Sequence, residues 1–321
     1  MKALVFEKAG ELSEMVHLSE VEKPEISASQ VLITVKARPV NPSDYLFVKG
    51  VYRKKATFPQ IAGLEGSGKI VECGEEVVDF NVGDHVAFRA LNTWAEYCAV
   101  EQEDLIKINQ NIPFEVSAQV GLNAITAVAL LEEAKIKAGD FLLINAASSS
   151  VSSIIIQLAM SKGIKVIALV NGSRHIPALI SLGVEAVFLH DDPALPQKLE
   201  LITKGSGIHG FLDAVGGETV TTVIPLMAAY GHIIIYGNFS NNEKATFTNA
   251  SIIYKNLTVI GFGIDHWLSQ QTSPKIQQSY NQIVEGLYTA ALSFRKTVSV
   301  PLGEFSLEKD HLDRTDKIII V

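Results

Sequence analysis

A run of small and hydroxyl side chains lies where a buried strand is followed by a helix. The apolar residues 141–144 predict the strand, the apolar spacing over 154–159 predicts the helix, and a second apolar run at 166–170 predicts another strand. In such a β-α-β unit the N–H groups at the helix start face a pyrophosphate. We therefore predict that this turn binds a dinucleotide through Ser149, Ser150, Val151 and Ser152.

The turn contains no glycine. Its residues from Asn145 to Ser153 read N-A-A-S-S-S-V-S-S, whereas the strong signal for a dinucleotide is G-x-G-x-x-G. Serine tolerates a positive φ poorly, so Ser152 would be strained by about 1–3 kcal/mol if its φ were positive. A plain β-α-β crossover that binds no nucleotide is the alternative for this stretch taken alone.

The loop after the second strand predicts which dinucleotide is bound. Folds that bind NAD carry an acid there for the ribose 2′-hydroxyl, whereas a nearby arginine suits a 2′-phosphate. Here the loop reads Asn171, Gly172, Ser173, Arg174, with no Asp or Glu. We predict NADPH, held by Asn171, Ser173 and Arg174; the alternative is a solvated arginine without a ligand.

A second group of reactive side chains lies between Asn41 and Tyr52. Ser43 is suited to cap a short helix that Gly50 ends. With Tyr45 on this helix and Tyr52 just beyond it, the segment would make a good wall for a substrate cleft. Because a tyrosine with a pKa of about 10 is protonated at neutral pH, it also serves as a proton donor.

Two glycine-containing turns follow later apolar runs. Gly216 lies in the sequence D-A-V-G-G, and Tyr236 ends the predicted strand 232–236, with Gly237 directly after it. Ligands of parallel sheets bind at the carboxyl ends of the strands, so we predict that these three residues contact the cofactor. The alternative is that the glycines serve only the turns.

Composition excludes several classes of function. The 321 residues are 47% hydrophobic and 19% charged, with a net charge of -8. Lys and Arg are scattered and form no basic patch, so we expect no nucleic-acid partner. We find no run of about 18 apolar residues and no signal-peptide pattern, and we therefore expect a cytoplasmic protein without a membrane partner.

The two cysteines, Cys73 and Cys98, are too few for a disulfide framework or a cysteine-rich zinc site. The eight histidines are dispersed, and no H-x-x-x-H or C-x-x-C spacing occurs. We therefore expect no bound metal.

The order of the predicted elements indicates two domains. Short strands separated by Gly, Pro, Asn and Asp fill the first hundred residues, whereas helices and strands alternate after a helix over 117–131, as in a doubly wound parallel sheet. An apolar strand is predicted over 253–261, and the last strand, 317–321, resembles the opening ones. We predict an α/β protein in which residues 119–255 form a parallel-sheet domain inserted into a mostly β domain, residues 1–118 and 256–321.

Seven short motifs occur in a fixed order along the chain: Asn41–Asp44, Gly50–Tyr52, Gly63–Gly68, Val82–Val86, Gly121–Ala127, Asp213–Gly217 and Gly261–Leu268. Together they resemble the medium-chain dehydrogenase/reductase superfamily, and most closely its zinc-independent branch of quinone oxidoreductases and 2-enoyl thioester reductases. The resemblance covers the whole chain. It implies a Rossmann domain inserted in a GroES-like catalytic domain, and NADPH as the cofactor.

The resemblance also implies residue roles. In the thioester reductases the tyrosine at the position of Tyr52 is the proposed acid. Asn41 and Thr126 match residues near the nicotinamide, and Trp267 matches a wall of the substrate cleft. Members commonly pair through the edge strand of the nucleotide domain, here near 252–260, which implies a homodimer. Leu64 stands where zinc-dependent alcohol dehydrogenases carry the histidine of G-H-E, which implies that zinc is not used.

Three functions agree with this sequence. The chain is predicted to reduce an α,β-unsaturated carbonyl compound, with Tyr52 as the proton donor, or a quinone, with Tyr52 only as a wall residue. The third hypothesis is a non-enzymatic NADPH-binding sensor that kept the fold, to which the serine-filled turn points. Ser150 and Ser152 depart from the small or glycine residues of the family's turn.

Overall fold

The computed structural model describes residues 1–239, 244–306 and 316–321. Its internal contacts divide the chain into unit 1, Met1–Ala124 with Tyr280–Val321, and unit 2, Ile125–Ser279. Unit 2 is inserted into unit 1, but its boundaries lie later than the predicted 119 and 255. The difference at the second boundary arises because strand β14 (Thr258–Gly261) pairs in parallel with β13 (Met227–Ile235) and so continues the sheet of unit 2.

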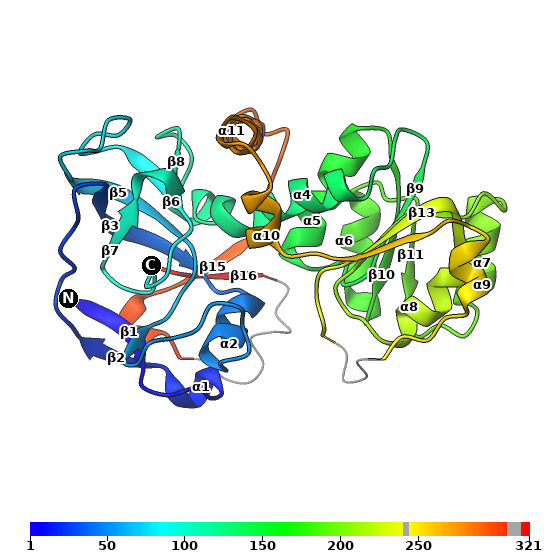
Figure 1. Cartoon of the computed structure of the whole chain (residues 1–321), viewed down its shortest axis with the longest axis horizontal. Helices are drawn as coiled ribbons and strands as arrows, with labels where there is room; N and C mark the ends of the chain where they lie inside the picture. The colour runs from blue at the N-terminus through cyan, green and yellow to red at the C-terminus, as the bar shows by residue number, and fades with distance from the viewer. Residues whose placement is uncertain (240–243, 307–315) are drawn as a thin grey trace. The chain divides into compact units, whose positions relative to one another are not determined.

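Unit 1 is mostly β. Its strands are β1 (Lys2–Phe6), β2 (His17–Glu20), β3 (Gln30–Pro39), β4 (Gln60–Ile61), β5 (Gly66–Cys73), β6 (His85–Phe88), β7 (Tyr97–Glu101), β8 (Leu105–Lys107), β15 (Thr297–Val300) and β16 (Lys317–Ile320). They form a sheet of order β15-β16-β3-β5-β6-β8, with β7 also paired to β3, and a smaller sheet of order β2-β1-β4. The last strand of the chain, β16, therefore pairs with β3, which belongs to the N-terminal part of the chain (Figure 1).

Short helices connect these strands: α1 (Leu12–Met15), α2 (Pro42–Val48) and α3 (Phe114–Ser117). Helix α2 begins after Asn41, so the prediction that Ser43 caps it was wrong. Proline at the first helical position suits this start because its fixed φ is already helical. Phe47 and Val48 are fully buried in a core cluster that includes Trp94, and each such burial is worth roughly 1.5–3 kcal/mol.

Unit 2 is a doubly wound parallel sheet. Its strands are β9 (Phe141–Ile144), β10 (Lys165–Val170), β11 (Ala186–Leu189), β12 (Ile208–Asp213), β13 and β14, in the spatial order β11-β10-β9-β12-β13-β14. Its helices are α4 (Ile125–Glu133), α5 (Ser150–Ser161), α6 (Ile176–Ser181), α7 (Leu195–Thr203), α8 (Glu218–Val223), α9 (Asn249–Ile253) and α10 (Ile264–Ser269), and α11 (Ser273–Tyr288) leads back to unit 1. Helices cover both faces of the sheet (Figure 1). The strand order reverses between β9 and β12, and folds of this type bind ligands at that switch point.

The apolar segment before this sheet is not the single helix predicted over 117–131. It divides into α3, a π-helix (Val120–Ala124) and α4. The interruption has a side-chain cause, because the Leu122 N–H donates to Glu65 Oε2 at 2.8 Å. Residues 114–133 are long and apolar enough to cross a membrane, contrary to the expectation that no such segment exists, but 78% of the most apolar window is buried inside the fold.

The predicted strand over 253–261 is shorter in the structure. Residues 249–253 form α9, which Thr248 caps by accepting the Ser251 N–H, and the strand begins only at Thr258. Lys255 and Asn256 separate the two elements, and the left-handed φ of 49° at Asn256 turns the chain from the helix into the strand.

Candidate active site

The predicted site residues belong to both units, and each unit is described by itself. Unit 2 carries the predicted cofactor residues together with Trp267, and unit 1 carries Asn41, Tyr45 and Tyr52.

The serine-rich turn lies at the carboxyl end of β9 and leads into α5. Ser149 is the N-cap residue, and its Oγ accepts the Ser152 N–H at 3.2 Å while donating to Ser152 Oγ at 2.9 Å. The first N–H groups of a helix have no acceptor inside the helix. Ser149 Oγ accepts the N–H of Ser152, so the N–H groups of Ser150 and Val151 are the ones available to bind a pyrophosphate.

Ser152 is not strained. It is fully buried and lies in the first turn of α5, and the residue of this turn with a positive φ is instead Ala146, at 45°. The strain predicted for Ser152 in the case of a positive φ therefore does not arise. A helical position accepts serine because its φ is negative there, so the absence of glycine costs nothing at this residue.

We expect Ser152→Gly to lower the stability of the protein by about 0.5–1 kcal/mol rather than to relieve strain, because glycine loses more backbone freedom in a helix. Ser152→Ala is the matched control that keeps the Cβ. Denaturant unfolding of the three proteins measures the difference. A more stable Ser152→Gly protein would contradict the helical description of this residue.

A buried pair of side chains joins the carboxyl ends of the two central strands. Asn145, after β9, donates through Nδ2 to Asp213 Oδ1 at the end of β12, and its Oδ1 accepts the Ala214 N–H at 2.7 Å. Asp213 also accepts the N–H of Gly216 at 3.0 Å. Burial raises the pKa of Asp213, and these hydrogen bonds oppose the shift. The pair fixes the turn that follows β12.

The glycine turns are built for close approach. Gly216 has a φ of 78°, which glycine adopts without cost, and a Cβ on Gly237 would come within 2.4 Å of the Ala214 carbonyl oxygen. Tyr236 directly precedes Gly237. Its hydroxyl oxygen is buried and makes no hydrogen bond within the described residues, although Ser152 is close enough to influence its pKa, which burial raises to about 12. A buried hydroxyl without a partner close to Ser152, in the first turn of α5, fits a polar ligand such as a dinucleotide.

The loop after β10 is open to solvent. Asn171, Ser173 and Arg174 are exposed, and Ser173 begins a short 3-10 helix. The Arg174 Nε lies 3.0 Å from the Nε2 of His175. An exposed guanidinium at the end of the second strand suits a 2′-phosphate.

The two remaining predicted residues of unit 2 lie on helices. Thr126 is half-buried on α4. Trp267 on α10 is only 4% exposed, so most of its indole packs inside the protein. Its role as a cleft wall stays a prediction that depends on the small exposed part.

Asn41 is held in unit 1 by a polar network and is 2% exposed. Its Nδ2 donates to Glu65 Oε1 at 2.8 Å, and its Oδ1 accepts hydrogen bonds from Asn123 Nδ2, at 2.9 Å, and from Lys317 Nζ. Only one Nδ2 hydrogen is left for another partner. The geometry therefore suits Asn41 to positioning its neighbours.

The two tyrosines lie at and beyond helix α2. Both are half-buried and pack against the cluster around Phe47. Burial raises the pKa of Tyr45 to about 12, so its hydroxyl stays protonated at neutral pH. The main chain at Tyr52 is fixed because its N–H donates to the Leu46 carbonyl at 3.0 Å.

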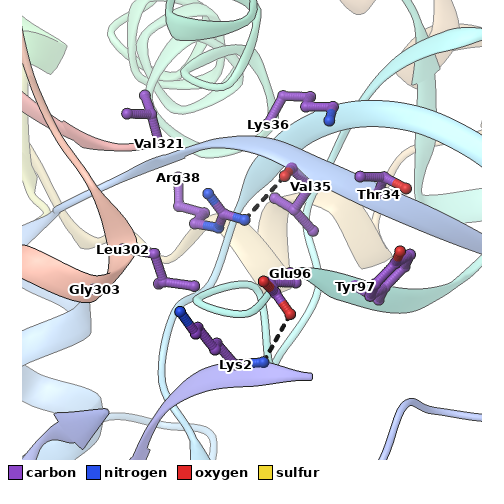
Figure 2. Close-up of a pocket in the computed structure, with 10 residues that line it drawn as sticks. All are labelled: Lys2, Thr34, Val35, Lys36, Arg38, Glu96, Tyr97, Leu302, Gly303 and Val321. Atoms are coloured by element: carbon purple, nitrogen blue, oxygen red, sulfur yellow. Dashed lines mark hydrogen bonds between the residues drawn. The ribbon is translucent and has the colours of Figure 1, made fainter. Parts of the chain in front are cut away.

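Unit 1 also contains a cavity of about 440 Å³ that none of the predicted site residues lines (Figure 2). The buried Arg38 lies on its wall and donates to backbone carbonyls, including that of Val35 at 2.9 Å. Lys2 and Lys36 add positive charge, and Glu96 adds negative charge. Because its buried guanidinium is occupied by backbone carbonyls, this cavity lacks the features of the predicted site.

Sequence reasoning missed the buried polar partners Glu65, Asn123, Asn145, Asp213 and Lys317. A signal existed only for some of them: Asp213 ends an apolar strand, and Lys317 precedes three isoleucines. A charged residue beside a buried strand has to find a partner. The partners themselves lie far away in the sequence.

Comparisons with known proteins agree with this architecture. Residues 27–138 match the family described as the alcohol dehydrogenase GroES-like domain, and residues 150–278 match the family described as zinc-binding dehydrogenase. A mitochondrial enoyl-[acyl-carrier-protein] reductase of Caenorhabditis elegans is 30% identical over 295 residues, which cover 89% of this chain and 83% of that protein. The enzyme of the same name from Xenopus tropicalis is 28% identical over 94% of this chain and 86% of its own length.

Solved structures show the same fold. A candidate NADPH:quinone reductase from Mesorhizobium loti has a TM-score of 0.90 and 26% identity, covering 100% of this chain and 98% of its own. Escherichia coli quinone oxidoreductase complexed with NADPH has a TM-score of 0.89 and 20% identity, with both chains covered completely.

Proposed function

Because the chain belongs to the medium-chain dehydrogenase/reductase superfamily, in its zinc-independent quinone and enoyl reductase branch, we propose that it reduces an α,β-unsaturated thioester or a quinone with NADPH. The observation that carries the proposal is the combination of two sites. Unit 2 offers a turn whose Ser150 and Val151 N–H groups have no acceptor among the described residues, and an exposed Arg174. Unit 1 offers Tyr52 just beyond α2, with its N–H bonded to the Leu46 carbonyl.

The chemistry assigns a role to each part. A bound nicotinamide supplies the hydride for the β-carbon of an enoyl substrate. Ser150 and Val151 would hold the pyrophosphate through their N–H groups, and Arg174 would hold the 2′-phosphate. Tyr52 would donate the proton to the α-carbon. Asn41, with its amide fixed by the network of unit 1, keeps α2 in place.

A thioester is favoured over a quinone as the substrate for two reasons. The enoyl-[acyl-carrier-protein] reductases are the relatives with 28–30% identity over most of the chain. A quinone needs no acid from the protein because its reduced product takes protons from water. An enoyl substrate needs one, and the family resemblance assigns that role to Tyr52. The sensor hypothesis is not favoured because Ser152, its main support, fits the turn without strain.

The test is a screen of NADPH oxidation over quinones, enals, enones and enoyl-CoA esters. We expect the highest kcat/KM for enoyl-CoA esters. Turnover of quinones alone would favour the quinone reductase. Binding of NADPH without turnover of any compound would favour the non-enzymatic sensor.

Zinc is not needed by this proposal, although one matching family is described as zinc-binding. Among the described residues no group of three His, Cys, Asp or Glu side chains is placed to hold a metal ion, and Leu64 has no ligand atom. We expect active, purified protein to contain far less than one zinc per chain and to keep its activity in a chelator. Elemental analysis with one zinc per active chain would contradict this.

Two further properties remain proposals. We propose a homodimer formed along β14, which pairs only with β13 among the described strands and lies close in sequence to the exposed Ile253 and Tyr254. Sedimentation equilibrium measures the mass. We also propose a cytoplasmic location, with a mitochondrial one as the alternative because the curated relatives carry that name; cell fractionation distinguishes the two.

A further inference from the structure

Unit 1 contains ionisable side chains whose burial the proposed chemistry does not by itself explain. Asp44, Glu65 and Lys317 are 1%, 0% and 6% exposed. Removing an isolated charge from water costs several kcal/mol, so buried charges persist where partners compensate them. Their partners therefore show what the three residues hold together.

Asn41 connects the ammonium to one of the carboxyl groups. Lys317 Nζ donates to the Val40 carbonyl at 2.7 Å and to Asn41 Oδ1. On its other side, the Asn41 amide nitrogen donates to Glu65, whose second oxygen accepts the Leu122 N–H. Turning the amide over would place its NH2 group against the Lys317 ammonium, so the network permits one orientation of Asn41.

The same network includes the first turn of α2. Asp44 Oδ2 accepts the Asn41 N–H at 2.7 Å, and Asp44 Oδ1 is buried without a hydrogen-bond partner among the described residues. At the other end of α2 the Val51 and Tyr52 N–H groups both donate to the Leu46 carbonyl. A single short helix therefore connects the buried network to the proposed proton donor.

From this geometry we propose that Lys317 is a positioning residue of the active site. From the last strand of the chain, its ammonium fixes Asn41, and Asn41 with Asp44 fixes the start of the helix that leads to Tyr52. The proposal rests on the proposed function for its kinetic consequence, but the position of α2 is measured without any substrate.

Exchange of backbone amides tests the positioning directly. Lys317→Met removes the ammonium, and Lys296→Met is the matched control because Lys296 is exposed and its carbonyl accepts the Lys317 N–H. We expect the amides of residues 40–52 to exchange at least about 10-fold faster in Lys317→Met, the loss expected for one charge-assisted hydrogen bond, and to be unchanged in Lys296→Met. Equal exchange in both variants would overturn the proposal.

Kinetics test the consequence for the reaction. We expect Lys317→Met to lower kcat for the enoyl substrate about 10-fold, while the Kd for NADPH stays within about 2-fold, because the cofactor residues lie on unit 2. If no substrate is turned over by the wild type, the proposed function fails while the exchange experiment still decides the positioning role.

A charge-balanced variant guards against misfolding of Lys317→Met. Glu65→Gln removes the carboxylate that the ammonium compensates, so the double variant Glu65→Gln, Lys317→Met contains neither charge. We expect the double variant to lose less than the product of the two single losses in kcat. Strictly multiplicative losses would show that the two residues act independently and would overturn the network.

The pH dependence of stability supplies a further check. Burial raises the pKa of Asp44 from 3.8 to about 8, with Lys317 opposing the shift and Glu65 adding to it; burial likewise raises the pKa of Glu65 to about 7 and lowers that of Lys317 to about 8. Arg89 lowers the pKa of Glu65, and Arg295 lowers that of Lys317. Burial and, to a smaller extent, Asp44 raise the pKa of Tyr45. Of the two carboxyl groups, Asp44 therefore has its pKa raised further and is the one that keeps its proton at pH 7.

Between pH 4 and 8 the native protein binds more protons at Asp44 than the unfolded chain does, so this residue makes stability fall as pH rises. Asp44→Asn cannot titrate and keeps an acceptor for the Asn41 N–H. We expect the free energy of unfolding of Asp44→Asn, relative to the wild type, to increase from pH 5 to pH 8 in urea titrations. No change over this range would show that Asp44 is already ionised in the native protein at pH 5, as it is in the unfolded chain, and would overturn its place in the network.

Discussion

Tyr52→Phe is expected to lower kcat/KM for an enoyl thioester by about 10²- to 10⁴-fold, the usual contribution of a positioned general acid. The change removes only the hydroxyl, and the ring keeps its packing against the core cluster that contains Phe47 and Trp94. The Kd for NADPH should stay unchanged because the proposed cofactor residues lie on the other unit. Stopped-flow and steady-state measurements of NADPH oxidation give both quantities.

Tyr45→Phe is the matched control. Tyr45 is also a half-buried tyrosine of the same segment, and it packs against the same cluster. A loss confined to Tyr52→Phe and to enoyl substrates supports proton donation. If Tyr52→Phe reduces enoyl thioesters as fast as the wild type does, Tyr52 is a wall residue, and the quinone reductase becomes the better description.

Arg174→Ala is expected to weaken NADPH binding by about 10-fold or more and to leave NADH binding nearly unchanged. A hydrogen bond to a charged group contributes about 1.5–3 kcal/mol, and only NADPH has the 2′-phosphate that would receive it. The loop contains no acid to hold a free 2′-hydroxyl, so NADH loses nothing when the guanidinium is removed. Calorimetric titration with each dinucleotide measures the two affinities.

Lys162→Ala controls for the loss of one positive charge from the same unit. Lys162 is exposed and follows the C-terminal end of α5, whereas the serine-rich turn lies at its start. We expect this variant to bind both dinucleotides like the wild type at moderate ionic strength, where distant surface charges are screened. Equal losses for NADPH and NADH in Arg174→Ala would show that Arg174 does not read the 2′-phosphate.

Local sequence patterns predicted the architecture of unit 2. The apolar runs at 141–144 and 166–170 and the helical spacing between them are local patterns, and they gave the β-α-β unit because a buried strand and an amphipathic helix differ in period. The same patterns located the serine-rich turn and the Arg174 loop at strand ends. They predicted element boundaries less well: Asn41 rather than Ser43 is the N-cap of α2, and the π-helix interrupts the helix predicted over 117–131.

The use of the polar residues depends on contacts between segments that are distant in the sequence. Asn41 meets Lys317 across 276 positions of sequence and Asn123 across 82, and no local pattern predicts which distant side chains share a buried space. The conformation of Ser152 was decided in the same way. Its place in the first turn of α5 and the cap from Ser149 give it an unstrained backbone. The sequence showed only that the turn lacks the glycines of the G-x-G-x-x-G motif. Hydrophobic periodicity is a property of neighbouring residues and can be recognised in the sequence. The pairing of buried charges depends on which distant segments the fold brings together.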